Sequence, residues 1–393
     1  MSVTAAKGFT AAGIAAGIKE NGNPDLALVV NEGPSRAAAG VFTSNRVKAA
    51  PVLWSEQVLK GGRVAAVVLN SGGANACTGP KGFQDTHATA EKVAEVLGGA
   101  DGGEVAAGEI AVASTGLIGL LLPMDKLLPG IEKAAAGLSG HGGEKAAIAI
   151  KTTDTVHKTA VAGGESDGVA WTVGGMAKGA GMLAPGLATM LVVLTTDAAV
   201  EAPALDTALR AATRTTFDRV DSDGCMSTND TVLLLASGAS GAVPAYDEFA
   251  EAVRAVCADL ARQLIGDAEG ASKDIRIEVV NAASEDDAVE VGRSIARNNL
   301  LKCAIHGEDP NWGRVLSAIG TTGAVFDPDR LNVAINDVWV CRNGSVGEDR
   351  DLVDMRYREV RITADLSAGT ESAVIWANDL TAEYVHENSA YSS

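Results

Sequence analysis

The decisive stretch of this chain reads Met176-Ala-Lys178-Gly-Ala-Gly181-Met-Leu-Ala-Pro185-Gly-Leu-Ala188-Thr189-Met190-Leu-Val-Val-Leu194. It is a glycine-rich loop that contains a lysine and a proline, ends in Ala-Thr, and continues directly into an apolar run typical of a buried strand. A threonine at the start of such a strand is either an ordinary strand residue or a nucleophile held by a rigid backbone. The local pattern alone leaves both interpretations open.

The nucleophile interpretation predicts that the chain cleaves itself. The Thr189 hydroxyl can attack the carbonyl of Ala188, and hydrolysis of the resulting ester splits the chain between these residues. The freed α-amino group of Thr189, with a reference pKa of about 7.7–8.0, can then act as the base that activates the hydroxyl. Strain assists the first step, and the loop glycines permit backbone conformations that other residues resist. The predicted products are residues 1–188 and 189–393, interleaved in one fold.

Composition indicates an acidic globular protein that works on small metabolites. Hydrophobic residues make up 47% and charged residues 21% of the chain, which is ordinary for a globular protein. With 393 residues, the chain exceeds a single ordinary core, so we expect two domains or two large lobes. The formal net charge of −18 argues against nucleic acid as a partner, because a phosphate backbone requires a basic surface.

Cysteine usage and hydropathy predict a soluble, cytoplasmic protein. The five cysteines form no CxxC pair and no metal-ligand spacing, so we expect reduced thiols; they are Cys77, Cys225, Cys257, Cys303 and Cys341. The N-terminal segment lacks the features of a signal peptide, and no stretch reaches the roughly 18 apolar residues needed to span a membrane.

Alternating strand and helix signals predict an α/β fold. Short apolar runs bounded by turn residues are typical of buried strands, and they occupy residues 26–30, 64–69, 110–114, 190–194 and 231–236. Helices are predicted over residues 87–97, 125–138, 204–216 and 246–264, the last with a regular apolar stripe. Alternation at Ile275, Ile277 and Val279 predicts a half-exposed strand, followed by a helix from Glu285 to about Leu300.

Motifs along the whole chain resemble one family. The decisive stretch is similar to the self-cleavage segment of the ArgJ family, the glutamate N-acetyltransferases also called ornithine acetyltransferases. Further segments resemble that family in the right order, at residues 7–13, 39–45, 70–79, 114–116, 152–155, 267–273, 306–314 and 388–393. The resemblance implies a layered αββα sandwich with the cut strand in its middle, plus a smaller C-terminal α/β lobe.

Acyl transfer needs a nucleophile, a base and donors for the oxyanion. Ser114-Thr115-Gly116 follows a predicted strand, so a hydroxyl and a backbone N–H can point together at a developing negative oxygen; an ordinary strand-end turn is the alternative. The resemblance implies that Thr115 and Gly116 form the oxyanion hole. Lys178 is the best candidate cation for a substrate α-carboxylate, and Glu269, expected at the end of a long helix, for a substrate ammonium. Their alternatives are a solvated loop lysine and a surface carboxylate.

The resemblance also implies that Thr152, Asn388 and Ser393 contact substrate, the last two from a C-terminal tail that folds over the pocket. The assignment to Thr152 can slip to its neighbour in Thr152-Thr-Asp-Thr155. We expect no metal and no resident cofactor. The segment 221–230 lacks the closing glutamate of a calcium loop, and we interpret it as a tight, hydrogen-bonded loop in the pocket wall. His306 has no second histidine at ligand spacing.

Three functions fit these observations. The favoured one is acetyl transfer from N-acetylornithine to glutamate through an acetyl-Thr189 intermediate, in the acetyl cycle of arginine biosynthesis, by a heterotetramer built from two copies of each cleaved chain. The second is a self-processing amide hydrolase that uses water as acceptor. The third is a non-catalytic amino-acid or nucleotide binding protein. The sequence does not decide whether acetyl-CoA also serves as a donor, nor whether the chain is a specialised paralogue.

Overall fold

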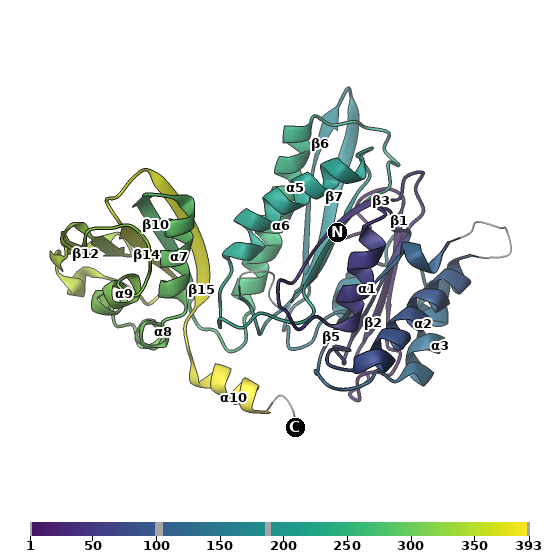
Figure 1. Cartoon of the computed structure of the whole chain (residues 1–393), viewed down its shortest axis with the longest axis horizontal. Helices are drawn as coiled ribbons and strands as arrows, with labels where there is room; N and C mark the ends of the chain where they lie inside the picture. The colour runs from purple at the N-terminus through teal and green to yellow at the C-terminus, as the bar shows by residue number, and fades with distance from the viewer. Residues whose placement is uncertain (1, 99–104, 185–189, 391–393) are drawn as a thin grey trace. The chain divides into compact units, whose positions relative to one another are not determined.

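The computed structural model of this chain describes residues 2–98, 105–184 and 190–390. These residues divide into two compact units, each described here by itself (Figure 1). The first comprises described residues within Met1–Met182, Gly186–Asp218 and Cys225–Leu264, and the second those within Leu183–Pro185, Arg219–Gly224 and Ile265–Ser393. The predicted cleavage site at Ala188-Thr189 and the predicted contact residue Ser393 lie outside the described residues.

The first unit is built on two β-sheets (Figure 1). One has four strands in the order β1-β2-β4-β5, namely β1 (Phe9–Ile14), β2 (Leu26–Asn31), β4 (Ala66–Ser71) and β5 (Ile110–Thr115). The other has five strands in the order β3-β9-β8-β7-β6, namely β3 (Ala37–Phe42), β9 (Thr231–Ala236), β8 (Leu191–Thr196), β7 (Val169–Lys178) and β6 (Lys158–Ser166).

Both faces of the four-stranded sheet are buried, which explains its continuous apolar strands. In β2, Leu26 and Leu28 enter a core shared with α2 (Gly79–Leu97) and α3 (Met124–Ala136). The alternate residues Ala27 and Val29 enter a second core, to which β8 and β9 of the other sheet contribute Val193 and Leu233. Since strand side chains alternate between faces, the two sheets pack against each other, with α2 and α3 outside.

Helices also cover the outer face of the five-stranded sheet. A Cβ added to Gly175 of β7 would lie 3.0 Å from side-chain atoms of Val256 and Leu260, so α6 (Tyr246–Gly266) packs closely on this sheet. The helix α5 (Ala202–Thr215) packs beside it on β3 and β9. In the same unit, α1 (Ala50–Leu59) contacts β5 and α2, and α4 (Gly143–Ala149) contacts β1 and β2. The layer order is therefore α-β-β-α, which confirms the expected sandwich.

The second unit is a smaller α/β structure with its own core. Its sheet has the order β13-β12-β11-β14-β10-β15, with bounds β10 (Asp274–Ala282), β11 (Asn332–Ile335), β12 (Val338–Arg342), β13 (Ser345–Val346), β14 (Glu359–Asp365) and β15 (Glu371–Asn378). Its helices are α7 (Glu285–Ala296), α8 (Asn299–His306), α9 (Trp312–Ile319) and α10 (Ala382–Ala390). Across the described ranges, no helix combines the length and hydropathy needed to cross a bilayer.

The structure confirms the predicted strands and corrects three local predictions. Lys178 does not lie in a loop, because it ends β7 and pairs with Leu191 of β8. The helix expected to run from Glu285 to about Leu300 breaks after Ala296, since the Asn298 side chain accepts a hydrogen bond from the Leu301 N–H and caps a new helix. Helix α6 ends at Gly266, so Glu269 lies in the turn that follows rather than at the helix end.

Candidate active site

The predicted oxyanion turn lies where β5 ends, next to the end of its parallel neighbour β4. The Thr115 carbonyl accepts hydrogen bonds from the N–H groups of Gly72 and Gly73, both at 3.0 Å. Gly116 has φ +129°, and a Cβ there would lie 2.5 Å from the backbone nitrogen of Gly73. Only glycine fits this close approach of two chain segments. The turn is therefore rigid, as a site with preorganised donors requires.

The side chain of Asn229 also binds the backbone of this turn. The Asn229 amide donates to the carbonyl of Ser114 at 2.8 Å and to the carbonyl of Ala74 at 2.6 Å. Asn229 belongs to the segment 221–230, which was expected to be a tight loop in the pocket wall. Residues of this segment up to Gly224 belong to the second unit, and those from Cys225 onward belong to the first.

The structure brings Lys178 to this turn. Its Nζ donates a hydrogen bond of 3.3 Å to Thr115 Oγ1, and only 1% of the lysine is exposed. The alternative of a solvated loop lysine is therefore wrong. Because the Thr115 oxygen accepts this bond, its own hydroxyl proton can be donated to another oxygen. A hydroxyl donor and a buried cation thus lie together at the ends of β5 and β7.

Asp154 connects the residue after this lysine, Gly179, to the predicted substrate residue Thr152. Its Oδ1 accepts hydrogen bonds of 2.7 Å from Lys158 Nζ and from the Gly179 N–H, and its Oδ2 accepts one of 3.0 Å from the Thr152 N–H. Burial alone would raise the pKa of Asp154, but the ammonium groups of Lys178 and Lys158, with these hydrogen bonds, hold it well below its usual range. Asp154 is therefore a buried carboxylate.

A second buried carboxyl, that of Asp230, binds the backbone of the residue that follows the predicted nucleophile in sequence. Asp230 Oδ1 accepts a hydrogen bond of 2.9 Å from the N–H of Met190, the residue that follows Thr189. Burial raises the pKa of Asp230 well above its usual value, against the lowering effects of the Met190 hydrogen bond and of Lys178. This shift favours the neutral acid. Asp230 therefore anchors the start of β8 with a group that can also donate a proton.

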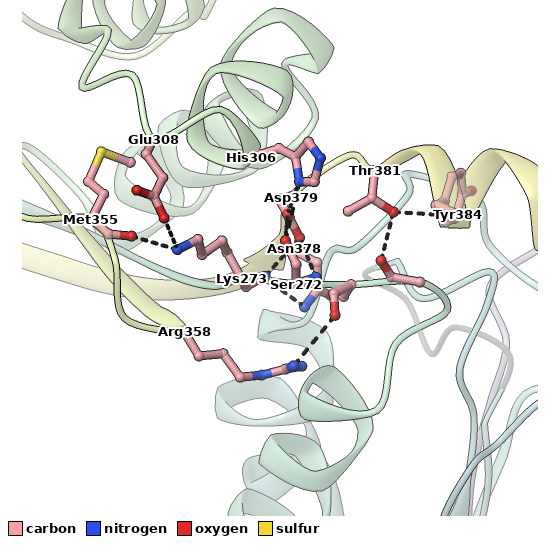
Figure 2. Close-up of polar contacts among 12 residues, drawn as sticks. Ser272, Lys273, His306, Glu308, Met355, Arg358, Asn378, Asp379, Thr381 and Tyr384 are labelled. Atoms are coloured by element: carbon pink, nitrogen blue, oxygen red, sulfur yellow. Dashed lines mark hydrogen bonds and ion pairs between the residues drawn. The ribbon is translucent and has the colours of Figure 1, made fainter.

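In the second unit, the structure brings Glu269 and Asn388 together. The Asn388 amide donates a hydrogen bond of 2.9 Å to Glu269 Oε2. Asn388 belongs to α10, whose first turn is fastened by Thr381: its hydroxyl donates to the Gly270 carbonyl at 2.6 Å and accepts from the Tyr384 N–H at 2.9 Å (Figure 2). The described part of the C-terminal tail is therefore tied to the turn that carries Glu269.

Ser272, His306 and Asp379 form a polar cluster that also fastens this tail (Figure 2). His306 Nδ1 lies 3.0 Å from Asp379 Oδ2 and 3.2 Å from Ser272 Oγ, and Ser272 also donates to Asp379. In a catalytic triad the acid and the nucleophile lie on opposite ring nitrogens. Here both meet the same nitrogen, so the cluster is structural.

Sequence reasoning missed Asp154, Lys158, Asn229 and Asp230. Asp154 lies within the segment Thr152-Thr-Asp-Thr155, which was singled out for its threonines. For Asp230, the available signal was a carboxylate directly before the apolar strand β9. Among the described residues, no group of three or more His, Cys, Asp or Glu side chains could hold a metal ion. The described cysteines Cys77, Cys257, Cys303 and Cys341 are free thiols.

The fold and this grouping define an α/β enzyme of the layered α-β-β-α class. The model of the ArgJ family matches residues 10–393, and the chain belongs to that family. Proteins named arginine biosynthesis bifunctional protein ArgJ from Streptomyces avermitilis and Streptomyces coelicolor are 83% and 81% identical to it, over 100% of both chains. The solved ornithine acetyltransferase from Mycobacterium tuberculosis, complexed with ornithine, is 61% identical, covers 48% of this chain and 96% of its own, and has a TM-score of 0.45.

Proposed function

We propose that this chain transfers an acetyl group from N-acetylornithine to glutamate and so serves arginine biosynthesis. The observation that carries the proposal is the grouping of the Thr115-Gly116 turn with the buried Lys178. Lys178 pairs across the sheet with Leu191, which is two residues after Thr189 in sequence. Membership of the ArgJ family supports the same activity. We place the enzyme in the cytoplasm, in keeping with the free thiols of Cys77, Cys257, Cys303 and Cys341.

In this proposal, Thr189 first releases itself as an N-terminus. Its hydroxyl adds to the Ala188 carbonyl, the peptide C–N bond breaks, and the nitrogen of Thr189 takes up the hydroxyl proton. Water then splits the ester into an Ala188 carboxylate and a free Thr189 hydroxyl. The products are residues 1–188 and 189–393. β8 follows the cut and pairs with β7, which precedes it, so the sheet can hold both products together. Two copies of each complete the proposed heterotetramer.

The acetyl transfer then takes two steps. The Thr189 oxygen attacks the acetyl carbonyl of N-acetylornithine, and its proton passes through the Thr189 α-amino group to the departing nitrogen of ornithine. The amine of glutamate next attacks the acetyl carbon of the acetyl-Thr189 ester, the ester C–O bond breaks, and the amine proton passes through the Thr189 α-amino group to the Thr189 oxygen, which releases N-acetylglutamate. In both steps the negative oxygen receives hydrogen bonds from the Thr115 hydroxyl and the Gly116 N–H. Such donors act mainly in the transition state.

The remaining residues orient the substrates. Lys178 binds the α-carboxylate that N-acetylornithine and glutamate share, and Glu269 binds a substrate ammonium. Thr152, Asn388 and Ser393 supply polar contacts. The hydrogen bond between Asn388 and Glu269 supports a common role for these two residues. No resident cofactor or metal is part of the proposal, and acetyl-CoA is tested as a second donor.

The test uses purified protein and N-acetylornithine labelled in its acetyl group. Incubation with glutamate should yield labelled N-acetylglutamate, and a quench without glutamate should leave the label on a peptide that begins at Thr189, as read by mass spectrometry. Labelled acetate as the main product in the presence of glutamate would instead identify an amide hydrolase. An uncleaved chain without turnover would leave a binding protein. A parallel reaction with acetyl-CoA as sole donor decides its use.

A further inference from the structure

Lys19 lies in the loop that joins β1 to β2, and one carboxylate holds this loop in a fixed shape. Asp25 is buried, and its two oxygens accept hydrogen bonds of 2.6, 3.1, 2.6 and 2.9 Å from the consecutive backbone N–H groups of residues 16–19. The Asp25 carbonyl also accepts a hydrogen bond from the N–H of Ser71, at the end of β4. The backbone position of Lys19 is therefore set without its own side chain.

The side chain of Lys19 contacts two segments that carry candidate site residues. A Cβ added to Gly72 would lie 3.2 Å from Lys19 Cγ, and the Gly72 N–H is one of the two that bind the Thr115 carbonyl. At its other end, Lys19 Nζ donates a hydrogen bond of 2.7 Å to the carbonyl of Lys151, directly before Thr152. The lysine stem therefore passes the oxyanion turn, and its ammonium group lies at the Thr152 segment.

The ammonium group of Lys19 keeps one donor for a ligand. Of its three N–H donors, two go to the carbonyls of Lys151 and Pro24, at 2.7 and 3.0 Å. Within residues 2–98, 105–184 and 190–390, this group has no other hydrogen-bond partner. The residue is only partly buried, so a ligand can reach it.

Charged neighbours of both signs act on Lys19. Burial, the largest effect, lowers its pKa, and the ammonium groups of Lys178 and Lys151 lower it further, while the carboxylates of Asp25 and Asp154 raise it. The net direction is downward, so these surroundings favour loss of the proton compared with a lysine in water. A carboxylate bound to the ammonium group would act in the opposite direction and stabilise its charge.

The two substrates of the proposed reaction differ in the group that this donor can bind. N-acetylornithine and glutamate share an α-carboxylate, which the proposed function gives to Lys178. Only glutamate carries a second carboxylate, on its side chain, whereas the side chain of N-acetylornithine ends in an ammonium group. A second lysine ammonium near the same turn therefore suits the acceptor, because cations bind carboxylates and repel other cations.

We propose that Lys19 binds the side-chain carboxylate of the acceptor glutamate, and so makes the site select an acidic amino acid over a neutral one. This inference rests on the proposed function and names the acceptor chemistry of the same site. Lys19 contacts substrate in this role but takes no part in bond breaking.

The test compares glutamate with glutamine as acceptors, in the wild type and in Lys19→Met. Glutamine has nearly the same size as glutamate but no side-chain charge. We expect Lys19→Met to lower kcat/KM for glutamate by roughly 10- to 150-fold, the equivalent of one charge-assisted hydrogen bond, and to lower the value for glutamine much less. The ratio of the two values is measured on one preparation, so it does not depend on the fraction of cleaved enzyme. An unchanged ratio would overturn the inference.

The donor half-reaction is the internal control. Release of ornithine from N-acetylornithine, measured before any acceptor is added, should keep its wild-type rate and KM in Lys19→Met, because the donor has no side-chain carboxylate. Lys178→Met should instead impair both half-reactions. Equal losses for donor and acceptor in Lys19→Met would show that Lys19 serves the shared α-carboxylate or the fold, and would contradict the inference.

Three further variants test the role of the charge. Lys19→Arg keeps the charge and should keep most of the preference for glutamate. Lys19→Gln offers N–H donors to the carbonyls of Pro24 and Lys151 without a charge, so it should lose this preference, and it replaces Lys19→Met if that variant does not fold. Lys151→Met is the matched control, since Lys151 Nζ donates to the Thr155 carbonyl at 3.2 Å in the same region. A loss of preference as large in Lys151→Met would assign the carboxylate to Lys151 and refute the role of Lys19.

Wild-type turnover tests the proposed function separately. An active wild type whose Lys19→Met variant still prefers glutamate to glutamine by the same factor would sink this inference alone. A cleaved wild type that transfers no acetyl group would remove the acetyl-transfer proposal, and this inference with it.

Discussion

Lys178→Met should weaken both substrates of the proposed reaction together. Methionine is close to lysine in length but cannot bind a carboxylate. In the proposed reaction, the α-carboxylate shared by N-acetylornithine and glutamate binds this one ammonium group, whose Nζ lies 3.3 Å from Thr115 Oγ1. Both half-reactions should therefore lose the same contact.

The magnitude follows from the burial of Lys178. A hydrogen bond to a charged group contributes about 1.5–3 kcal/mol, which corresponds to a loss of roughly 10- to 150-fold in kcat/KM. Lys178 is only 1% exposed, so water screens its charge little and we expect the upper half of this range. The variant should stay folded, because Asp154 keeps its hydrogen bonds to Lys158, Gly179 and Thr152.

The assay measures kcat/KM for each substrate with the other held saturating, and Lys81→Met is the control. Lys81 pairs with Asp85, and its side chain is 60% exposed within α2, so its loss should leave both values unchanged. An effect of Lys178→Met on only one substrate would refute a single shared carboxylate site. Donor and acceptor would then need separate pockets.

Three further outcomes are expected. Thr189→Ala should leave a full-length, inactive chain on denaturing gels, and cleavage that persisted in it would point to a contaminating protease. Thr115→Ala should lower kcat by roughly 10²–10³-fold with donor binding nearly intact, and unchanged turnover would remove Thr115 from the oxyanion role. Burial raises the pKa of Asp221 from 3.8 to about 6, against the lowering effect of Arg297, so the folded state binds this proton more tightly and stability falls as pH rises through that interval. Denaturant unfolding at pH 4 and pH 7 should therefore show Asp221→Asn gaining about 2 kcal/mol on the wild type, and a constant difference would mean that Arg297 keeps the carboxylate charged throughout.

The sequence by itself determined the elements whose information is local. The apolar runs at β2, β4, β5, β8 and β9 were recognisable because strands covered on both faces need apolar residues at every position. The long helices followed from their periodic stripes. The candidate residues were assigned from the family resemblance, and the matching family model and close relatives confirm that the chain belongs to this family.

The tertiary structure alone decided which of these residues meet. Strand β6 is rich in glycine and polar residues, and adjacent glycines interrupt the apolar residues of β7, so this hairpin gave a weak strand signal and Lys178 was assigned to a loop. The break at Asn298 depends on a cap that competes with helix continuation. The contacts of Lys178 with Thr115, Asp154 with Gly179, and Asp230 with Met190 join residues 63, 25 and 40 positions apart. Such pairs are set by sheet register and by the burial of charge, which no local pattern of residues encodes.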